Sequence, residues 1–227
     1  MNPERHGANE PLRTFIEEFY KEKFSFDDTF QKLYQEERMV LYEQILKIIK
    51  ELKISSLLDV GCSFGLLVER CNLEGIDAYG LDLPVDSLKK YHQNLPHSQG
   101  KFLYGSINEG AFLETVGSKD SGALILLDTL RYIVYPNNLA ILNYKYIIIR
   151  EVSNNFYITL LRNKQNDNID VKLYSPLECL KLFRNYYPYQ IRFYRYSKNL
   201  NLPNKWGLVF INAIFPSYTL VLKRDDI

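Results

Sequence analysis

Short apolar runs alternate with helical spacings along most of this chain. Five segments are nearly continuously apolar: SSLLDVG, GIDAYGLDL, KFLYGS, GALILLD and YKYIIIREV. After each of the first three comes a stretch with helical spacing: FGLLVERC, VDSLKKYHQ and INEGAFLETV. Near-continuous apolar strands that alternate with helices are typical of a parallel sheet covered on both faces.

The two ends of the chain follow other patterns. Residues 1–10 are polar, and from Pro11 to about Leu52 apolar residues recur at spacings of three and four, which predicts helices. Near the other end, SPLECLKLFRNYY opens with a Ser–Pro pair and predicts a helix over 175–187. QIRFYRYS and SYTLVLKR predict a strand pair that closes the sheet. We expect one α/β domain, in which residues 1–52 form a helical cap on a core of residues 53–227.

Composition and charge exclude several classes of protein. The 227 residues include 28 Lys and Arg against 27 Asp and Glu, so a net charge of +1 does not favour a nucleic-acid partner. No stretch approaches the ~18–20 apolar residues of a membrane span, and the first ten residues lack an apolar signal core. Three cysteines without metal-ligand spacing fit a reducing cytosol. We therefore expect a cytoplasmic protein with no metal and no membrane partner.

One segment of the chain has a composition that could indicate nucleic-acid binding. Residues 181–205 are basic and interleaved with aromatic rings, a composition that can grip RNA or an anionic substrate. The period-two pattern of QIRFYRYS, however, divides its rings and charges between the two faces of a strand. We interpret this segment as part of the sheet.

The segment with the most chemistry runs from Leu57 to Leu83. A strand ends in Asp59, the turn from Gly61 to Gly65 leads into a helix, and a second strand ends in Asp82, 23 positions after the first acid. Glycines let a backbone turn tightly and approach a ligand, and the helix presents free N–H groups at its start. A carboxylate at the end of the second strand can accept two hydrogen bonds from ribose hydroxyls.

These residues resemble motif I and the following acid of the class I S-adenosylmethionine (SAM)-dependent methyltransferases. LDVGCSFG matches the family pattern of apolar residues, an acid, a glycine and a glycine-containing turn. The resemblance implies a Rossmann-like fold: a seven-stranded, mostly parallel sheet with the last strand antiparallel, helices on both faces, and the helical cap over a SAM site. A dinucleotide-binding turn would have the pattern G-x-G-x-x-G, and this turn lacks its second and third glycines.

The resemblance also implies which residues bind SAM. Asp59 would hold the methionine end through the turn, and Asp82 the ribose. The expected cofactor-binding residues are Asp59, Gly61, Cys62, Ser63, Phe64, Gly65, Asp82, Leu83, Ser106, Ile107, Asp128 and Thr129.

The chain departs from the family pattern at two places in this set. Ser63 stands where the family has the middle glycine of the turn. Ser106 and Ile107 stand where the family often has an acid that binds the adenine amino group, and Asn108 or Glu109 could substitute for them.

The fourth and fifth predicted strands end in polar residues. Asp128 and Thr129 stand where the family contacts the methionine part of SAM and the incoming substrate, and Arg131 and Tyr132 follow. Alternatively, Asp128 caps a helix and Arg131 is solvated. Glu151 would either orient the acceptor or cap a turn.

The expected function is transfer of the SAM methyl group to oxygen or nitrogen of a small-molecule acceptor, a metabolite or natural product. Neutral charge and the tyrosine-rich cap favour a small molecule, and a homodimer is compatible with this prediction. Two alternatives stay open: a non-catalytic partner subunit with this fold, and a nicotinamide-dependent oxidoreductase. The expected catalytic residues are Tyr132 and Glu151, and the expected substrate-pocket residues are Tyr20, Tyr34 and Arg131.

Residues outside these motifs receive plainer predictions. The three histidines, His6, His92 and His97, belong to no motif and are predicted to be exposed. Cys62 has no base beside it in the sequence and is predicted to be a small packing residue rather than a nucleophile.

Overall fold

The computed structural model describes residues 18, 28–107, 122–133, 136, 139, 142–152, 173–193 and 217–225, with the backbone alone for 28–37 and 193. The helix predicted in INEGAFLETV lies outside these residues beyond Ile107, as does the predicted pocket residue Tyr20. Tyr34 is described only as a backbone position in a helix. No helix in the described ranges is long and apolar enough to cross a membrane.

Seven strands form one sheet. Their order across the sheet is β3 (Phe102–Tyr104), β2 (Asp77–Asp82), β1 (Ser56–Val60), β4 (Ala123–Leu127), β5 (Tyr146–Val152), β7 (Ser217–Arg224) and β6 (Tyr186–Phe193). The pairs β1–β4, β2–β3 and β4–β5 are parallel, whereas β7 is antiparallel to both β5 and β6. The predicted seven-stranded, mostly parallel sheet with its last strand antiparallel is therefore confirmed. The chain divides into two compact units, residues 1–55 with 62–105 and residues 56–61 with 106–227.

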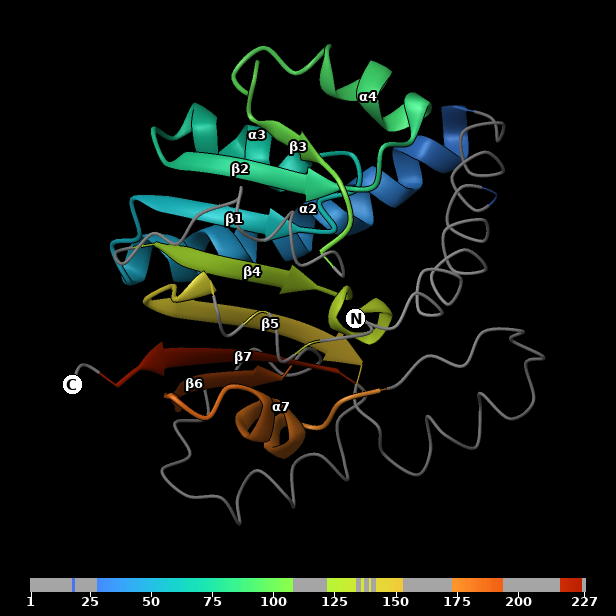
Figure 1. The fold of residues 1–227 in the computed structure, drawn as a ribbon. Coiled ribbons are helices and arrows are strands. Elements are labelled where there is room, and N and C mark those ends of the chain that lie inside the picture. Colours follow the sequence, from blue (N-terminus) through green and yellow to red (C-terminus); the bar gives the residue numbers. More distant parts are fainter. Residues whose placement is uncertain are drawn as a thin grey trace, which may run out of the picture. The chain divides into compact units, whose positions relative to one another are not determined.

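In the described part of the first unit there are three helices and two strands, labelled in Figure 1. Apolar residues recur along α2 (Asp28–Glu51) at the predicted spacing, and Ile45 and Ile49 on it are fully buried. This helix packs against the one that follows the glycine turn. The elements are α2 (Asp28–Glu51), α3 (Leu66–Leu73), β2 (Asp77–Asp82), α4 (Asp86–His92) and β3 (Phe102–Tyr104).

The second unit contains the other five strands, and α7 packs against β6 within it (Figure 1). Every residue of β1 and β4 is buried, as the near-continuous apolar pattern of these strands predicts. The elements are β1 (Ser56–Val60), β4 (Ala123–Leu127), the one-turn 3-10 helix η2 (Leu130–Tyr132), β5 (Tyr146–Val152), α7 (Pro176–Leu182), β6 (Tyr186–Phe193) and β7 (Ser217–Arg224).

The helix predicted over 175–187 is correct at its start and wrong at its end. Ser175 caps α7 in a capping box with Glu178, and Pro176 occupies the first turn. The helix stops at Leu182, and Tyr186 already pairs with Arg224 of β7. The apolar spacing continues past Leu182, but the chain from Tyr186 onward pairs with β7 instead of extending the helix. The hydrogen bonds of the sheet then satisfy the backbone N–H and C=O groups of these residues.

Candidate functional site

In the first unit, Asp82 holds the turn that follows β1. Its Oδ2 accepts a hydrogen bond from the Ser63 amide at 2.6 Å, and its Oδ1 accepts one from the Leu83 amide at 2.8 Å. Burial raises the pKa of Asp82 to about 6, and the two amide hydrogen bonds act in the opposite direction. A carboxylate oxygen has two lone pairs, so each oxygen can still accept one bond from a ligand hydroxyl.

Ser63 occupies a strained position in the turn. Its φ is 51°, in the left-handed region that favours glycine. The φ values of Gly61 (73°) and Gly65 (69°) lie in the same region. Its Oγ is buried and has no hydrogen-bond partner within the described part of the chain. A strained backbone and an unpaired buried hydroxyl both cost stability, and such features concentrate at binding sites.

His92 is predicted from the sequence to be exposed, and that prediction is wrong. The side chain is buried, with Nε2 2.7 Å from the Ser63 carbonyl oxygen and Nδ1 3.0 Å from the Tyr104 hydroxyl. Its ring stacks on Phe102 at 3.8 Å between centroids. The spacing of Leu88 and His92, one helical turn apart on α4 and both buried, is the signal that could have found it.

Both glycines of the turn are required by neighbouring side chains. A Cβ at Gly65 would lie 2.5 Å from the Phe102 ring. A Cβ at Gly61, in the second unit, would lie 2.4 Å from Thr129 Oγ1. The sequence pattern predicts these glycines for the approach of a ligand; packing within each unit demands them as well.

In the second unit, four charged side chains gather at the carboxyl ends of β4 and β5. Arg131 Nη2 lies 3.0 Å from Asp128 Oδ1 and 2.9 Å from Glu151 Oε2, and Arg150 pairs with the other oxygen of Asp128. The side chain of Arg131 is 15% exposed, so the alternative of a solvated arginine is wrong. The N-cap of η2 is Thr129, so Asp128 is an ion-pair partner there and not the cap.

Glu151 is the most deeply buried member of this cluster. Its side chain is 0% exposed, and Nε and Nη2 of Arg131 lie 3.0 and 2.9 Å from its Oε2. Oε1 is buried without a hydrogen-bond partner among the described residues. Burial raises the pKa of Glu151 to about 7; Arg131 opposes the rise and Asp128 adds to it. A carboxyl group in this state can gain or lose a proton near neutral pH, which is what general acid–base chemistry needs.

The sequence matches no family model and no curated protein. Solved structures are similar in fold. A SAM-dependent methyltransferase from Archaeoglobus fulgidus is 18% identical with a TM-score of 0.60, over 87% of this chain and 100% of that one. Magnesium protoporphyrin IX methyltransferase from Synechocystis PCC 6803, solved with bound SAH (S-adenosylhomocysteine), is 13% identical with a TM-score of 0.64, over 96% and 100%. A S-adenosylmethionine-dependent methyltransferase from Clostridium acetobutylicum is 15% identical with a TM-score of 0.56, over 82% and 91%.

This chain has the class I methyltransferase fold. Within that fold, the motif residues of the first unit lie on and after the glycine turn. Cys62 is buried, and its Sγ would lie 2.7 Å from a Cβ at Gly80, which agrees with the predicted packing role. Phe64 is buried edge-on against Tyr91, with ring centroids 5.1 Å apart. Leu83 is half-buried.

The motif residues of the second unit lie on β1, in the segment after β4 and in the segment after β3. Asp59 is buried on β1, in register with Ile125 of β4. Thr129 Oγ1 donates to the Leu127 carbonyl at 3.1 Å. Tyr132 ends η2, and its ring lies 6.0 Å from the Arg131 guanidinium carbon. The two residues expected near the adenine follow β3: Ser106 is half-buried and Ile107 is buried.

The described part of the chain contains no group of three or more His, Cys, Asp or Glu that could hold a metal ion.

The pKa of Glu151 leads to a testable dependence of stability on pH. Because its folded-state value of about 7 lies above the usual 4.5, the folded protein binds the proton more tightly than the unfolded chain does. The free energy of unfolding should therefore fall as pH rises from about 4.5 through about 7. Glu151→Gln stays neutral at every pH and should flatten this part of the curve. Between pH 5 and pH 8 its free energy of unfolding should therefore rise relative to that of the wild type, by an amount of the order of 3 kcal/mol.

Urea unfolding of both proteins between pH 5 and pH 8 checks this expectation. Glu43→Gln, which removes a half-exposed carboxylate at the surface, is the matched control. If the Glu151→Gln curve runs parallel to the wild-type curve, Glu151 does not titrate as its burial requires.

Proposed function

We propose that this protein is a SAM-dependent methyltransferase that transfers a methyl group to an oxygen or nitrogen atom of a small-molecule acceptor. The observation that carries the proposal is Asp82, a buried carboxylate at the end of β2 with one lone pair left on each oxygen. A ribose diol offers two O–H donors for those two acceptors. The fold similarity, including a neighbour solved with bound SAH, supports the same cofactor.

A second feature of the glycine turn, the buried hydroxyl of Ser63, also fits SAM. The buried Oγ of Ser63, without a partner in the described residues, is a polar group that a ligand can satisfy. In this proposal Asp82 holds the ribose, Asp59 and the turn hold the methionine end, and Ser106 and Ile107 flank the adenine. Bound SAM supplies a methyl group already activated on a sulfonium, so the protein needs mainly to align an acceptor lone pair with it.

Glu151 is proposed as the residue that takes the acceptor's proton. Arg131 holds Oε2 at 2.9 Å and leaves Oε1 without a partner among the described residues. Above its pKa of about 7, Oε1 can accept a proton from an O–H or N–H group. Tyr132, next to Arg131 in η2, is proposed to orient the acceptor. Residues 1–52 are proposed as a cap that excludes water, and Tyr20 and Tyr34 are proposed as residues of the acceptor pocket.

Calorimetry with SAM, S-adenosylhomocysteine and NAD tests the cofactor. We expect binding of the first two and none of NAD, because the glycine turn lacks the dinucleotide pattern. Tight NAD binding with no response to the other two would overturn the proposal. Transfer of labelled methyl from SAM to a panel of phenols, amines and carboxylic acids then tests the reaction. Cofactor binding without transfer to any acceptor, together with a stable protein partner, would indicate a non-catalytic subunit instead.

A further inference from the structure

We propose that His92 is a positioning residue that locks Ser63 in its left-handed conformation and so holds the Ser63 amide on Asp82. The ligand side of this inference rests on the proposed function, since Asp82 is the residue proposed to bind the cofactor ribose. The conformational side rests on the first unit alone.

Both sides of Ser63 are tied by buried polar groups. The Ser63 carbonyl oxygen only accepts, so His92 Nε2 carries the proton and donates across 2.7 Å. In the neutral ring Nδ1 is then an acceptor, and the Tyr104 hydroxyl donates to it across 3.0 Å. The Ser63 amide donates to Asp82 Oδ2 across 2.6 Å. One continuous chain of hydrogen bonds therefore runs Tyr104–His92–Ser63–Asp82.

Ser63 needs such a clamp because its side chain opposes its backbone conformation. Of the three positive-φ positions in the turn 61–65, it is the one with a Cβ, at a φ of 51°. Left to itself, a serine would relax to negative φ, and its amide would rotate away from the carboxylate. Ser63 Oγ makes no hydrogen bond to the described residues and does not support the conformation.

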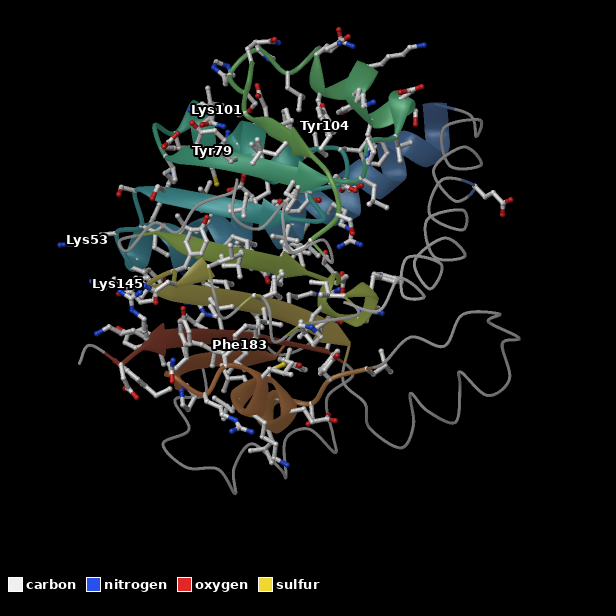
Figure 2. All side chains as sticks on the ribbon, viewed as in Figure 1. Lys53, Tyr79, Lys101, Tyr104, Lys145 and Phe183 are labelled. Atoms are coloured by element: carbon white, nitrogen blue, oxygen red, sulfur yellow. The ribbon has the colours of Figure 1, made fainter. Side chains whose placement is uncertain are left out.

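His92 is itself held rigidly enough to act as the clamp. Its ring stacks on Phe102 with an interplanar angle of 9°, and Tyr104, labelled in Figure 2, continues the stack at 5.8 Å. Gly65 leaves the space that this stack occupies, because a Cβ there would lie 3.2 Å from His92 Cδ2 and nearer still to Phe102. Tyr104 pairs directly with Asp82 in the β2–β3 register, so the two ends of the chain of hydrogen bonds are neighbours in the sheet.

A purely structural role would not require this arrangement. A phenylalanine could fill the same space and stack on Phe102, whereas both polar atoms of His92 are used and one of them is aimed at the backbone of the turn. The buried ring also has its pKa lowered by desolvation, which favours the neutral form that the chain of hydrogen bonds requires.

The test is a double-mutant cycle between His92 and Ser63, read by the affinity for S-adenosylhomocysteine. His92→Phe keeps the ring and loses both hydrogen bonds, and we expect an affinity loss of about 5–20-fold. Ser63→Gly removes the need for a clamp, because glycine adopts positive φ without strain. Adding His92→Phe to Ser63→Gly should therefore cost about 2-fold or less. Losses that multiply independently would overturn the proposal, since a packing role alone gives that result.

Hydrogen exchange of the Ser63 amide gives a readout that needs no ligand. We expect faster exchange in His92→Phe than in the wild type, and a smaller change for the same substitution in the Ser63→Gly background. Tyr104→Phe, which removes only the outer hydrogen bond, is the second variant and should show a weaker effect of the same kind. If wild-type protein does not bind the ligand, the proposed cofactor fails while amide exchange still tests the clamp. Unchanged exchange in both variants would overturn the clamp itself.

Discussion

Replacing Asp82 with alanine is expected to weaken binding of S-adenosylhomocysteine by about 10–100-fold while the fold persists. Each charge-assisted hydrogen bond to a ribose hydroxyl is worth about 1.5–3 kcal/mol, and water replaces part of the two that are lost. The variant also leaves the Ser63 and Leu83 amides without their acceptor, which loosens the turn and adds to the loss. Calorimetry measures the affinity, and circular dichroism checks the fold.

Asp86→Ala is the matched control for this experiment. Asp86 begins α4 just after β2, its side chain is 89% exposed, and it pairs with Lys89 at the surface. Removing it changes the net charge equally and should leave the affinity unchanged. An unaltered affinity in Asp82→Ala, with an unaltered spectrum, would remove Asp82 from the binding site.

The pH dependence of the same affinity gives an independent check. The carboxylate accepts hydrogen bonds, and its proton returns as pH falls through about 6, the raised pKa of Asp82. Wild-type affinity should therefore fall below about pH 6, and Asp82→Asn should lose this part of the dependence.

The largest loss of stability is expected from Gly61→Val. The φ of 73° costs a residue with a Cβ about 1–2 kcal/mol. That Cβ would also lie 2.4 Å from Thr129 Oγ1 and 2.6 Å from its Cγ2, and overpacking of this kind costs about 1–3 kcal/mol. Together these terms lower the free energy of unfolding by about 2–5 kcal/mol, and cofactor binding should be lost with the turn.

Gly75→Val separates the two terms. Gly75 has a nearly identical φ of 77°, and a Cβ added there would have no heavy atom of the described residues within 4 Å beyond its chain neighbours. Urea unfolding should therefore show a loss for Gly75→Val that is smaller by the cost of the Thr129 contact. Equal losses in the two variants would mean that Thr129 yields freely and that backbone strain alone makes Gly61 necessary.

Much of the fold could be predicted because parallel strands buried on both faces read as continuous apolar runs. SSLLDVG and GALILLD contain β1 and β4, in which every residue is buried. The boundary between α7 and β6 could not be predicted, since the apolar spacing runs on past Leu182 and the ladder with β7 decides where the helix stops.

The candidate site divides in the same way. Asp82 could be predicted from its place at the end of a strand, whereas its bond to an amide 19 residues earlier depends on tertiary structure. The burial of His92 is signalled by its spacing from Leu88 on α4, but its hydrogen bond to a carbonyl 29 residues away could not be predicted from a local pattern. The sequence leaves two interpretations of Arg131 open for the same reason: its partner Glu151 lies 20 residues further on.

The edge strand β6 affects how two copies of this protein can associate. β6 lies at one end of the sheet, and its register with β7 shifts between Pro188 and Gln190. Proline lacks a backbone donor and a bulge twists its strand, so β6 is an irregular template for pairing near Pro188. Interruptions of this kind discourage edge-to-edge addition of a second sheet and the aggregation that follows from it. We therefore expect that two copies of this protein do not associate by extending the sheet across β6.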